Sequence, residues 1–437
     1  MSQNLGREYT KFVSQNILGM LGISIYILAD TFYISKAAGS NGITVLNLCL
    51  PLYNLIYAIG SMIGVGSATR FTILKAQRDS GCDRFFSNAV FCCLIISIPF
   101  ILTGAFSPDG ILRIMGGDAD IASLGVPYAR IFLMFAPFFM INFIINAFVR
   151  NDGAPSLAMA ATLAGSFFNI IFDYIFMFPM GMGMGMAGAA LATALSPIVS
   201  TCICGIHFLK KDNQIRFLWQ PPSPKRLFQA CQLGTSAFIG EFSSGVTTTT
   251  FNFLILGIAG NVGVAAYGVI ANLALVATAM FNGVAQGSQP LISRYYGKGD
   301  TLAARRLLRY GIATALALSI VILFITRAQT DLLIAMFNSE GSKELHGLAF
   351  DGIRLYFPGF IFAGINIVAT GYLSASDCAL QALAASFSRG VIAIILCAFT
   401  LSRILGMRGI WSSFMAAEML TTIMIMIMLV YLNKRRK

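Results

Sequence analysis

Long apolar stretches recur along this chain, and they constrain its fold more than any other feature. A stretch of about 20 apolar residues is long enough for a helix to cross about 30 Å of hydrocarbon. Of the 437 residues, 57% are hydrophobic and 11% are charged, whereas soluble domains contain roughly 25% charged residues. The sequence therefore predicts an all-α integral membrane protein with twelve transmembrane helices, at residues 12–35, 43–69, 86–106, 124–148, 157–178, 186–209, 231–257, 263–290, 308–326, 346–372, 380–401 and 409–432.

The basic residues of the loops predict the orientation of these helices. Both termini and the loops on their side contain 21 Lys and Arg residues, whereas the loops on the other side contain six. Because loops rich in Lys and Arg stay in the cytoplasm, both termini are expected there. The net charge of +12 then serves topology and contact with anionic lipid headgroups, so membrane lipids are expected partners and nucleic acid is not.

The two halves of the chain repeat each other. When the sequence is shifted along itself without a gap, one constant offset pairs many glycines, a proline of each half and a loop arginine of each half, among them Gly19 with Gly240, Gly39 with Gly260, Arg84 with Arg305, Pro137 with Pro358, Ala164 with Ala385 and Gly188 with Gly409. Since each copy has six crossings, both copies must have the same orientation, as parallel repeats. We expect two pseudo-symmetric six-helix lobes at residues 1–212 and 227–437, joined by a cytoplasmic linker at 213–226.

Duplicated lobes favour transport over catalysis. Pseudo-symmetric lobes with a site at their interface are how alternating-access transporters are built. A membrane enzyme would need a clustered His/Asp or metal motif, and an ATP-driven pump a phosphate-binding loop, and neither motif occurs. The nine cysteines form no CxxC pair, and His207 and His346 are far apart. We therefore expect no enzyme activity, no cofactor and no resident metal.

Two acidic residues in the first half are candidates for ion coupling. Asp30 lies near the outer end of the first span, and Asn169 and Asp173 lie four residues apart on one face of the fifth. Ionisable groups inside a membrane are costly and usually functional. Apolar surroundings and a neighbouring like charge both favour the protonated carboxyl group, so the pair could exchange a proton, or its oxygens could bind sodium. Alternatively, Asp30 reaches interfacial water.

Other polar residues are candidates for substrate binding. Glu241 is followed at helical spacing by Thr248 and Asn252, and this stripe could line a cavity with Glu241 as counter-ion for a cationic substrate. Asn142 and Asn146 form another i, i+4 pair, for which interhelical packing is the alternative. In the second half, Gln286 is a further candidate for substrate binding, and we expect Arg389 to pair structurally with Glu418.

Several segments resemble the multidrug and toxic compound extrusion (MATE) family. They are Gln15–Met20 with Tyr26–Phe32, Gly181-Met with Ala187–Thr193, Gln286–Pro290 and Trp411-Ser with Ala417-Glu418. Their order covers essentially the whole chain. The resemblance implies two six-helix lobes that export amphipathic, usually cationic compounds in exchange for protons or sodium. It also implies that Asp30, Asn169, Asp173 and Thr193 form the cation site and that Glu241 is the acid of the second lobe.

In one respect the first helix of this chain differs from that of several family members. Several family members have a proline in the first half of the first helix, whereas this chain has only Gly19 and Gly22 there.

We expect a monomeric efflux antiporter of the bacterial inner membrane that acts on small molecules. The alternative is a flippase or exporter of lipid-linked saccharides or of another endogenous metabolite, which would need a basic central cavity for pyrophosphate.

Overall fold

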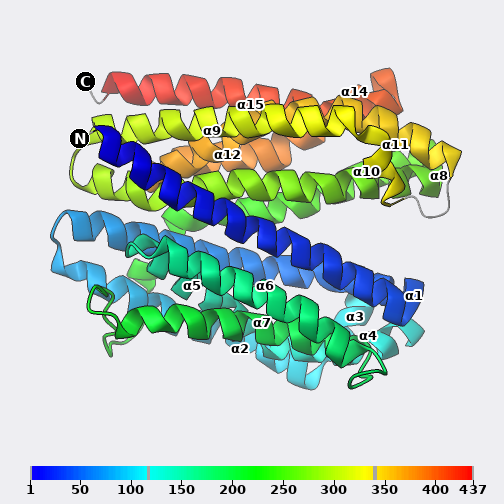
Figure 1. The fold of residues 1–437 in the computed structure, drawn as a ribbon, viewed down its shortest axis with the longest axis horizontal. Coiled ribbons are helices and arrows are strands. Elements are labelled where there is room, and N and C mark those ends of the chain that lie inside the picture. Colours follow the sequence, from blue (N-terminus) through cyan, green and yellow to red (C-terminus); the bar gives the residue numbers. More distant parts are fainter. Residues whose placement is uncertain (1, 116–118, 338–341, 436–437) are drawn as a thin grey trace. The chain divides into compact units, whose positions relative to one another are not determined.

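A computed structural model describes residues 2–115, 119–337 and 342–435, and within these residues the chain is helical and contains no β-strand (Figure 1). The helices of the first half are α1 (Ser2–Ala76), η1 (Ser80–Cys82), α2 (Asp83–Phe106), α3 (Pro108–Ile114), α4 (Ala119–Met134), α5 (Ala136–Asn151), α6 (Pro155–Met177), α7 (Met186–Gly205) and η2 (Ile206–Leu209). Those of the second half are α8 (Pro224–Gly297), α9 (Thr301–Ala328), α10 (Thr330–Ala335), α11 (Lys343–Tyr356), η3 (Phe357–Gly359), α12 (Phe360–Ala375), α13 (Ala379–Phe387), the π-helix η4 (Ser388–Ala393), α14 (Ile394–Leu405) and α15 (Met407–Arg435).

These helices account for the twelve predicted crossings. Ten helical segments of the described chain are long and apolar enough to span a membrane, and α1 provides two of them because it breaks at Gly39. The 74 residues of α8 count once among the ten, but a straight helix of that length would extend about 110 Å. Since α8 breaks at Gly260, it forms two crossings. The bent pair of α4 and α5 forms one more.

The sequence repeat is reproduced in the backbone. Gly39 has φ 60° and ψ −150°, and its counterpart in the second copy, Gly260, has φ 61° and ψ −155°. Gly185 and Gly406 are related by the same offset and precede α7 and α15 with φ 55° and φ 58°. Residues with a Cβ rarely adopt such angles, so glycine is required at these breaks in both copies.

The two copies differ by a short insertion near the predicted proline kink. α4 and α5 are bent by 44° at a break beside Pro137, which lies in the first turn of α5. In the second copy Pro358 lies instead in the short helix η3, between α11 and α12. As a result α12 begins later, at Phe360, than the offset of the repeat predicts from the start of α5 at Ala136. The single ungapped offset is therefore wrong across this stretch, because η3 adds residues at the bend.

The structure divides into two compact units that interleave along the chain. One contains Met1–Ile17, Ile239–Ile292 and Asp300–Lys437, and the other contains Leu18–Phe238 and Ser293–Gly299. The chain passes between units after Ile17 in α1 and after Phe238 in α8, which are equivalent positions of the repeat. The predicted lobes 1–212 and 227–437 stay a prediction. Two of the basic residues counted for the orientation of the helices, Arg436 and Lys437, lie outside the described residues.

Each unit is built by helix packing. In the unit of Leu18–Phe238, α7 packs against α4, α5 and α6, and α2 packs against α4 and α5. In the other unit, α15 packs against α11, α12 and α14, and α12 packs against α9. The predicted linker 213–226 is non-helical up to Ser223, and its last residues begin α8.

Candidate cation-coupling site

Two buried carboxyl groups meet inside the unit of Leu18–Phe238. Asp30 on α1 and Asp173 on α6 are 8% and 0% exposed, and their carboxyl groups are close enough to share a proton. Asp30 Oδ1 and both carboxylate oxygens of Asp173 receive no hydrogen bond. Two buried carboxylates cannot both stay ionised at this separation without a positive partner. A proton held by the pair, or a cation bound between its oxygens, would satisfy both groups.

The amide predicted to support this pair lies in place. Asn169 is one turn before Asp173 on α6, and its Nδ2 donates to Thr193 Oγ1 on α7 at 3.2 Å. Asn169 Oδ1 is buried and receives no hydrogen bond. The site therefore combines carboxylate and amide oxygens, a donor set that suits hard cations as well as protons. The structure brings all four predicted residues of this site into one unit.

Two tyrosines lie near the acidic pair, and sequence analysis did not assign them to the site. Tyr26 and Tyr128 both interact electrostatically with Asp30 and Asp173. The Tyr26 hydroxyl also lies 3.2 Å from the Tyr53 hydroxyl, within a cluster that continues to other aromatic rings. Tyr26 precedes Asp30 by four residues, so it lies on the same helical face. That spacing is the one signal in the sequence that could have placed Tyr26 here.

Asn142 and Asn146 hold helices together. Asn146 Nδ2 donates to Thr162 Oγ1 on α6 at 3.0 Å, and Thr201 Oγ1 on α7 donates to Asn142 Oδ1 at 3.5 Å. The packing interpretation of this pair thus has direct contacts in its favour.

The second unit repeats one of these contacts. Thr422 Oγ1 on α15 donates to Asn366 Oδ1 on α12 at 2.9 Å. Thr422 is the counterpart of Thr201 under the offset of the repeat, and Asn366 is the counterpart of Asn142 once the insertion at η3 is included. A bond that recurs in both copies at equivalent positions points to a structural role.

The candidate substrate stripe lies in the other unit, on α8. Glu241 and Asn252 are half-buried and Thr248 is exposed. Thr248 hydrogen-bonds with the Tyr267 hydroxyl, whereas Glu241 has no hydrogen bond or ion pair within the described part of the chain. Gln286, on α8 beyond the break at Gly260, is half-buried and has an interaction partner. The stripe thus offers one carboxylate that no protein group neutralises among the described residues.

The predicted pairing of Arg389 with Glu418 is confirmed. Arg389 Nε in the π-helix η4 donates to Glu418 Oε1 on α15 at 2.6 Å. Asn366 Nδ2 donates to Glu418 Oε2 at 2.7 Å, so both carboxylate oxygens have partners. This buried acid is compensated by protein groups, in contrast to Asp30 and Asp173.

Comparisons with known proteins agree with this architecture. The MatE family model matches residues 16–175 and 237–399. Multidrug export protein MepA of Staphylococcus saprophyticus is 27% identical over 96% of this chain and 92% of its own length. MepA of Staphylococcus aureus strain MRSA252 is 25% identical over the same shares.

Solved structures match the fold. A multidrug resistance MATE family transporter of the MOP superfamily in an outward-facing conformation has a TM-score of 0.91 at 21% identity, covering 98% of this chain and 96% of its own. A MOP superfamily transporter from Pyrococcus furiosus, described as having a binding pocket of reversed polarity, has a TM-score of 0.89 at 21% identity over 96% and 94% of the two chains.

Proposed function

Because the chain belongs to the MatE family, we propose that it is a secondary active antiporter that exports amphipathic, cationic small molecules in exchange for H⁺ or Na⁺. The similarity to multidrug export proteins over nearly the whole chain supports this proposal. The alternative of a lipid-linked saccharide flippase receives no comparable support from these relatives.

The coupling ion binds at Asp30 and Asp173, with Asn169 and Thr193 completing the site. The observation that carries this assignment is the set of buried oxygens without donors on Asp30, Asn169 and Asp173. When a proton or cation is bound, the carboxyl pair is neutralised and can stay buried. When it leaves, the two negative charges repel each other and favour a conformation that admits water.

The substrate binds in the second unit through Glu241. Its carboxylate is half-buried and has no partner within the described residues, so a cationic substrate would supply the missing charge. Thr248, Asn252 and Gln286 would contribute polar contacts, and Asn142 and Asn146 are assigned to packing by their bonds. The protein acts as a monomer in the bacterial inner membrane, with both termini in the cytoplasm.

Efflux from proteoliposomes tests the assignment. With a fluorescent organic cation as probe, the wild type should export it under an imposed pH gradient or an imposed Na⁺ gradient, and the effective gradient identifies the ion. Asp30→Asn and Asp173→Asn should each abolish gradient-driven export. The control is Asp109→Asn, which alters an acid whose side chain is 49% exposed and pairs with Arg113 on α3. Export at the wild-type rate by both site variants would refute the coupling site.

A further inference from the structure

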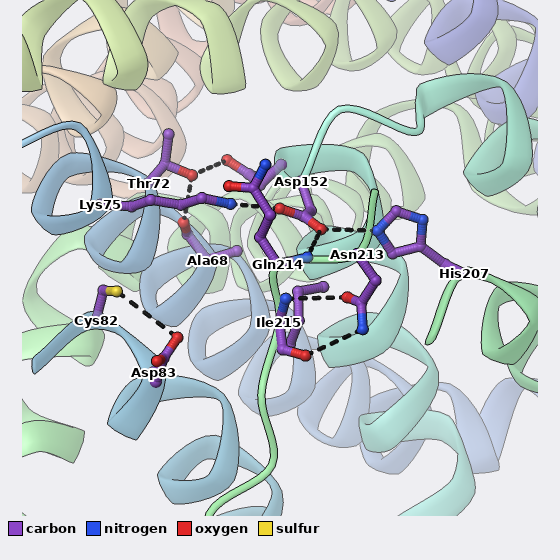
Figure 2. A network of polar contacts seen from close by, with 11 residues as sticks. Ala68, Thr72, Lys75, Cys82, Asp83, Asp152, His207, Asn213, Gln214 and Ile215 are labelled. Atoms are coloured by element: carbon purple, nitrogen blue, oxygen red, sulfur yellow. Dashed lines mark hydrogen bonds and ion pairs between the residues drawn. The ribbon is translucent and has the colours of Figure 1, made fainter. Parts of the chain in front are cut away.

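Another buried carboxylate, Asp152, lies directly after the end of α5, in the loop before α6. The Asp152 side chain is 1% exposed. It accepts hydrogen bonds from Lys75 Nζ on α1, from His207 Nε2 on η2 at 2.8 Å and from the backbone N–H of Gln214 at 2.8 Å (Figure 2). One carboxylate thus joins the ends of three helical segments to the segment between α7 and α8.

That segment, residues 210–223, is fastened to the same unit at further points. Leu218 N donates to Ser87 Oγ at 2.7 Å, and Ser223 N donates to Asn88 Oδ1 at 2.6 Å. The Ile215 side chain is 3% exposed and belongs to the hydrophobic core of this unit. A non-helical segment has no ladder of its own for its N–H groups, so side chains of α2 and of the α5–α6 loop provide the acceptors.

The residues that fasten this segment are not repeated in the second copy. In the second copy the positions of Lys75 and His207 are held by tyrosine and methionine, and the positions of Ser87 and Asn88 by leucine and arginine. With the insertion at η3 included, the position of Asp152 is held by serine. The residues at the second copy's positions are Tyr296, Met428, Leu308, Arg309 and Ser376. The anchoring residues are therefore not a shared property of the repeat, and what they contact in the first copy is the segment 210–223.

We infer that Asp152 is a positioning residue that clamps the linker 210–223 to the helix ends of this unit, so that the linker moves with the unit during transport. This inference rests on the proposed transport function. A free chain of this length would have an end-to-end distance of about 20 Å and would act as a flexible linker. After the linker the chain stays in this unit up to Phe238 and passes to the other unit at Ile239, inside α8, so we expect displacement after the linker to be absorbed in that helix and not in the linker.

Limited proteolysis tests the clamp without transport. Arg216 is an exposed tryptic site between the anchored residues Gln214 and Leu218. A protease needs a locally unfolded segment, so cleavage after Arg216 should be at least tenfold faster in Asp152→Ala and in Ser87→Ala. Asp212→Ala, at an exposed linker position, should match the wild type. Hydrogen exchange at the Gln214 and Leu218 amides should rise in the same variants.

Transport kinetics test whether the clamp matters. We expect Asp152→Ala to lower the maximal export rate at least tenfold with KM within twofold of the wild type, and Asp152→Glu to restore part of the rate. If Asp152→Ala fails to fold, Ser87→Ala releases the linker without removing the carboxylate. If cleavage after Arg216 is as slow in the Asp152→Ala and Ser87→Ala variants as in the wild type, the linker is not held by these residues. If cleavage is faster but the export rate is that of the wild type, the attachment of the linker has no role in transport. A wild type without export would refute the proposed function and leave the proteolysis result standing.

Discussion

At the scale of single residues, the buried acids of this protein differ in whether protein groups hydrogen-bond to their carboxylate oxygens. Glu418 has a partner on each carboxylate oxygen, from Arg389 and Asn366. Asp30 and Asp173 face each other, and three of their four oxygens receive no hydrogen bond. A buried carboxylate whose charge is balanced by protein groups stabilises the fold only while all its partners remain. Two buried carboxylates without such partners destabilise the fold unless a proton or cation neutralises them.

This contrast predicts opposite effects of neutral substitutions on stability. Glu418→Gln leaves the half-buried Arg389, whose side chain is 24% exposed, without its counter-ion and should destabilise the protein by about 1.5–3 kcal/mol. Asp173→Asn removes a charge that has no partner and should leave the unfolding temperature equal or higher. Thermal unfolding in detergent, followed by size-exclusion fluorescence, measures both. Arg113→Gln, which breaks an exposed ion pair, should change stability by less than about 1 kcal/mol. Equal losses in the two acid variants would contradict this interpretation.

Glu241 gives a second prediction at this scale. Glu241→Gln keeps the size of the side chain and removes its charge, so KM for a monocationic probe should rise at least tenfold, which corresponds to about 1.4 kcal/mol. The maximal rate should change little, because the coupling acids are intact. Export assays over a range of probe concentrations separate the two constants. Glu344→Gln, at an exposed position in the first turn of α11, serves as the control, and an unchanged KM would remove Glu241 from the substrate site.

At the scale of elements, the breaks in α1 and α8 allow one continuous helical segment to cross the membrane twice. Gly39 and Gly260 adopt nearly the same angles, and a Cβ at either position would meet no atom within 4 Å. Glycine is required there for backbone conformation alone, since space is available. The sequence repeat located both residues, but only the dihedral angles show that they turn the chain.

Substitutions at these breaks should therefore cost backbone strain. Gly39→Ala and Gly260→Ala should each destabilise the protein by about 1–3 kcal/mol. Gly257→Ala is the matched control, because it lies on the same helix, has helical angles and also has open space around a Cβ. It should be neutral or slightly stabilising. Thermal unfolding distinguishes them, and equal effects at Gly257 and Gly260 would contradict a conformational requirement.

At the scale of the whole molecule, orientation is a prediction from the distribution of charge. Loop arginines and lysines place the termini in the cytoplasm. The α6–α7 loop, with Met182 64% exposed, is then expected outside, and the linker inside.

Accessibility to a membrane-impermeant maleimide tests this orientation. On a cysteine-free background, Met182→Cys should be labelled in right-side-out vesicles and Lys211→Cys only in inverted ones. Both positions are exposed in the structure, so exposure does not distinguish them. Labelling of both from the same side would contradict the predicted topology.

The sequence by itself determined the class of the protein, its crossings, its duplication and the family it belongs to. These properties depend on local composition and on spacing along the chain, which add up segment by segment. Only the tertiary structure decided that Asp30 meets Asp173, that Asn142 and Asn146 bond to neighbouring helices, and that Asp152 gathers Lys75 and His207. Such pairs join helices distant in sequence, and a one-dimensional pattern does not specify which helical faces pack together.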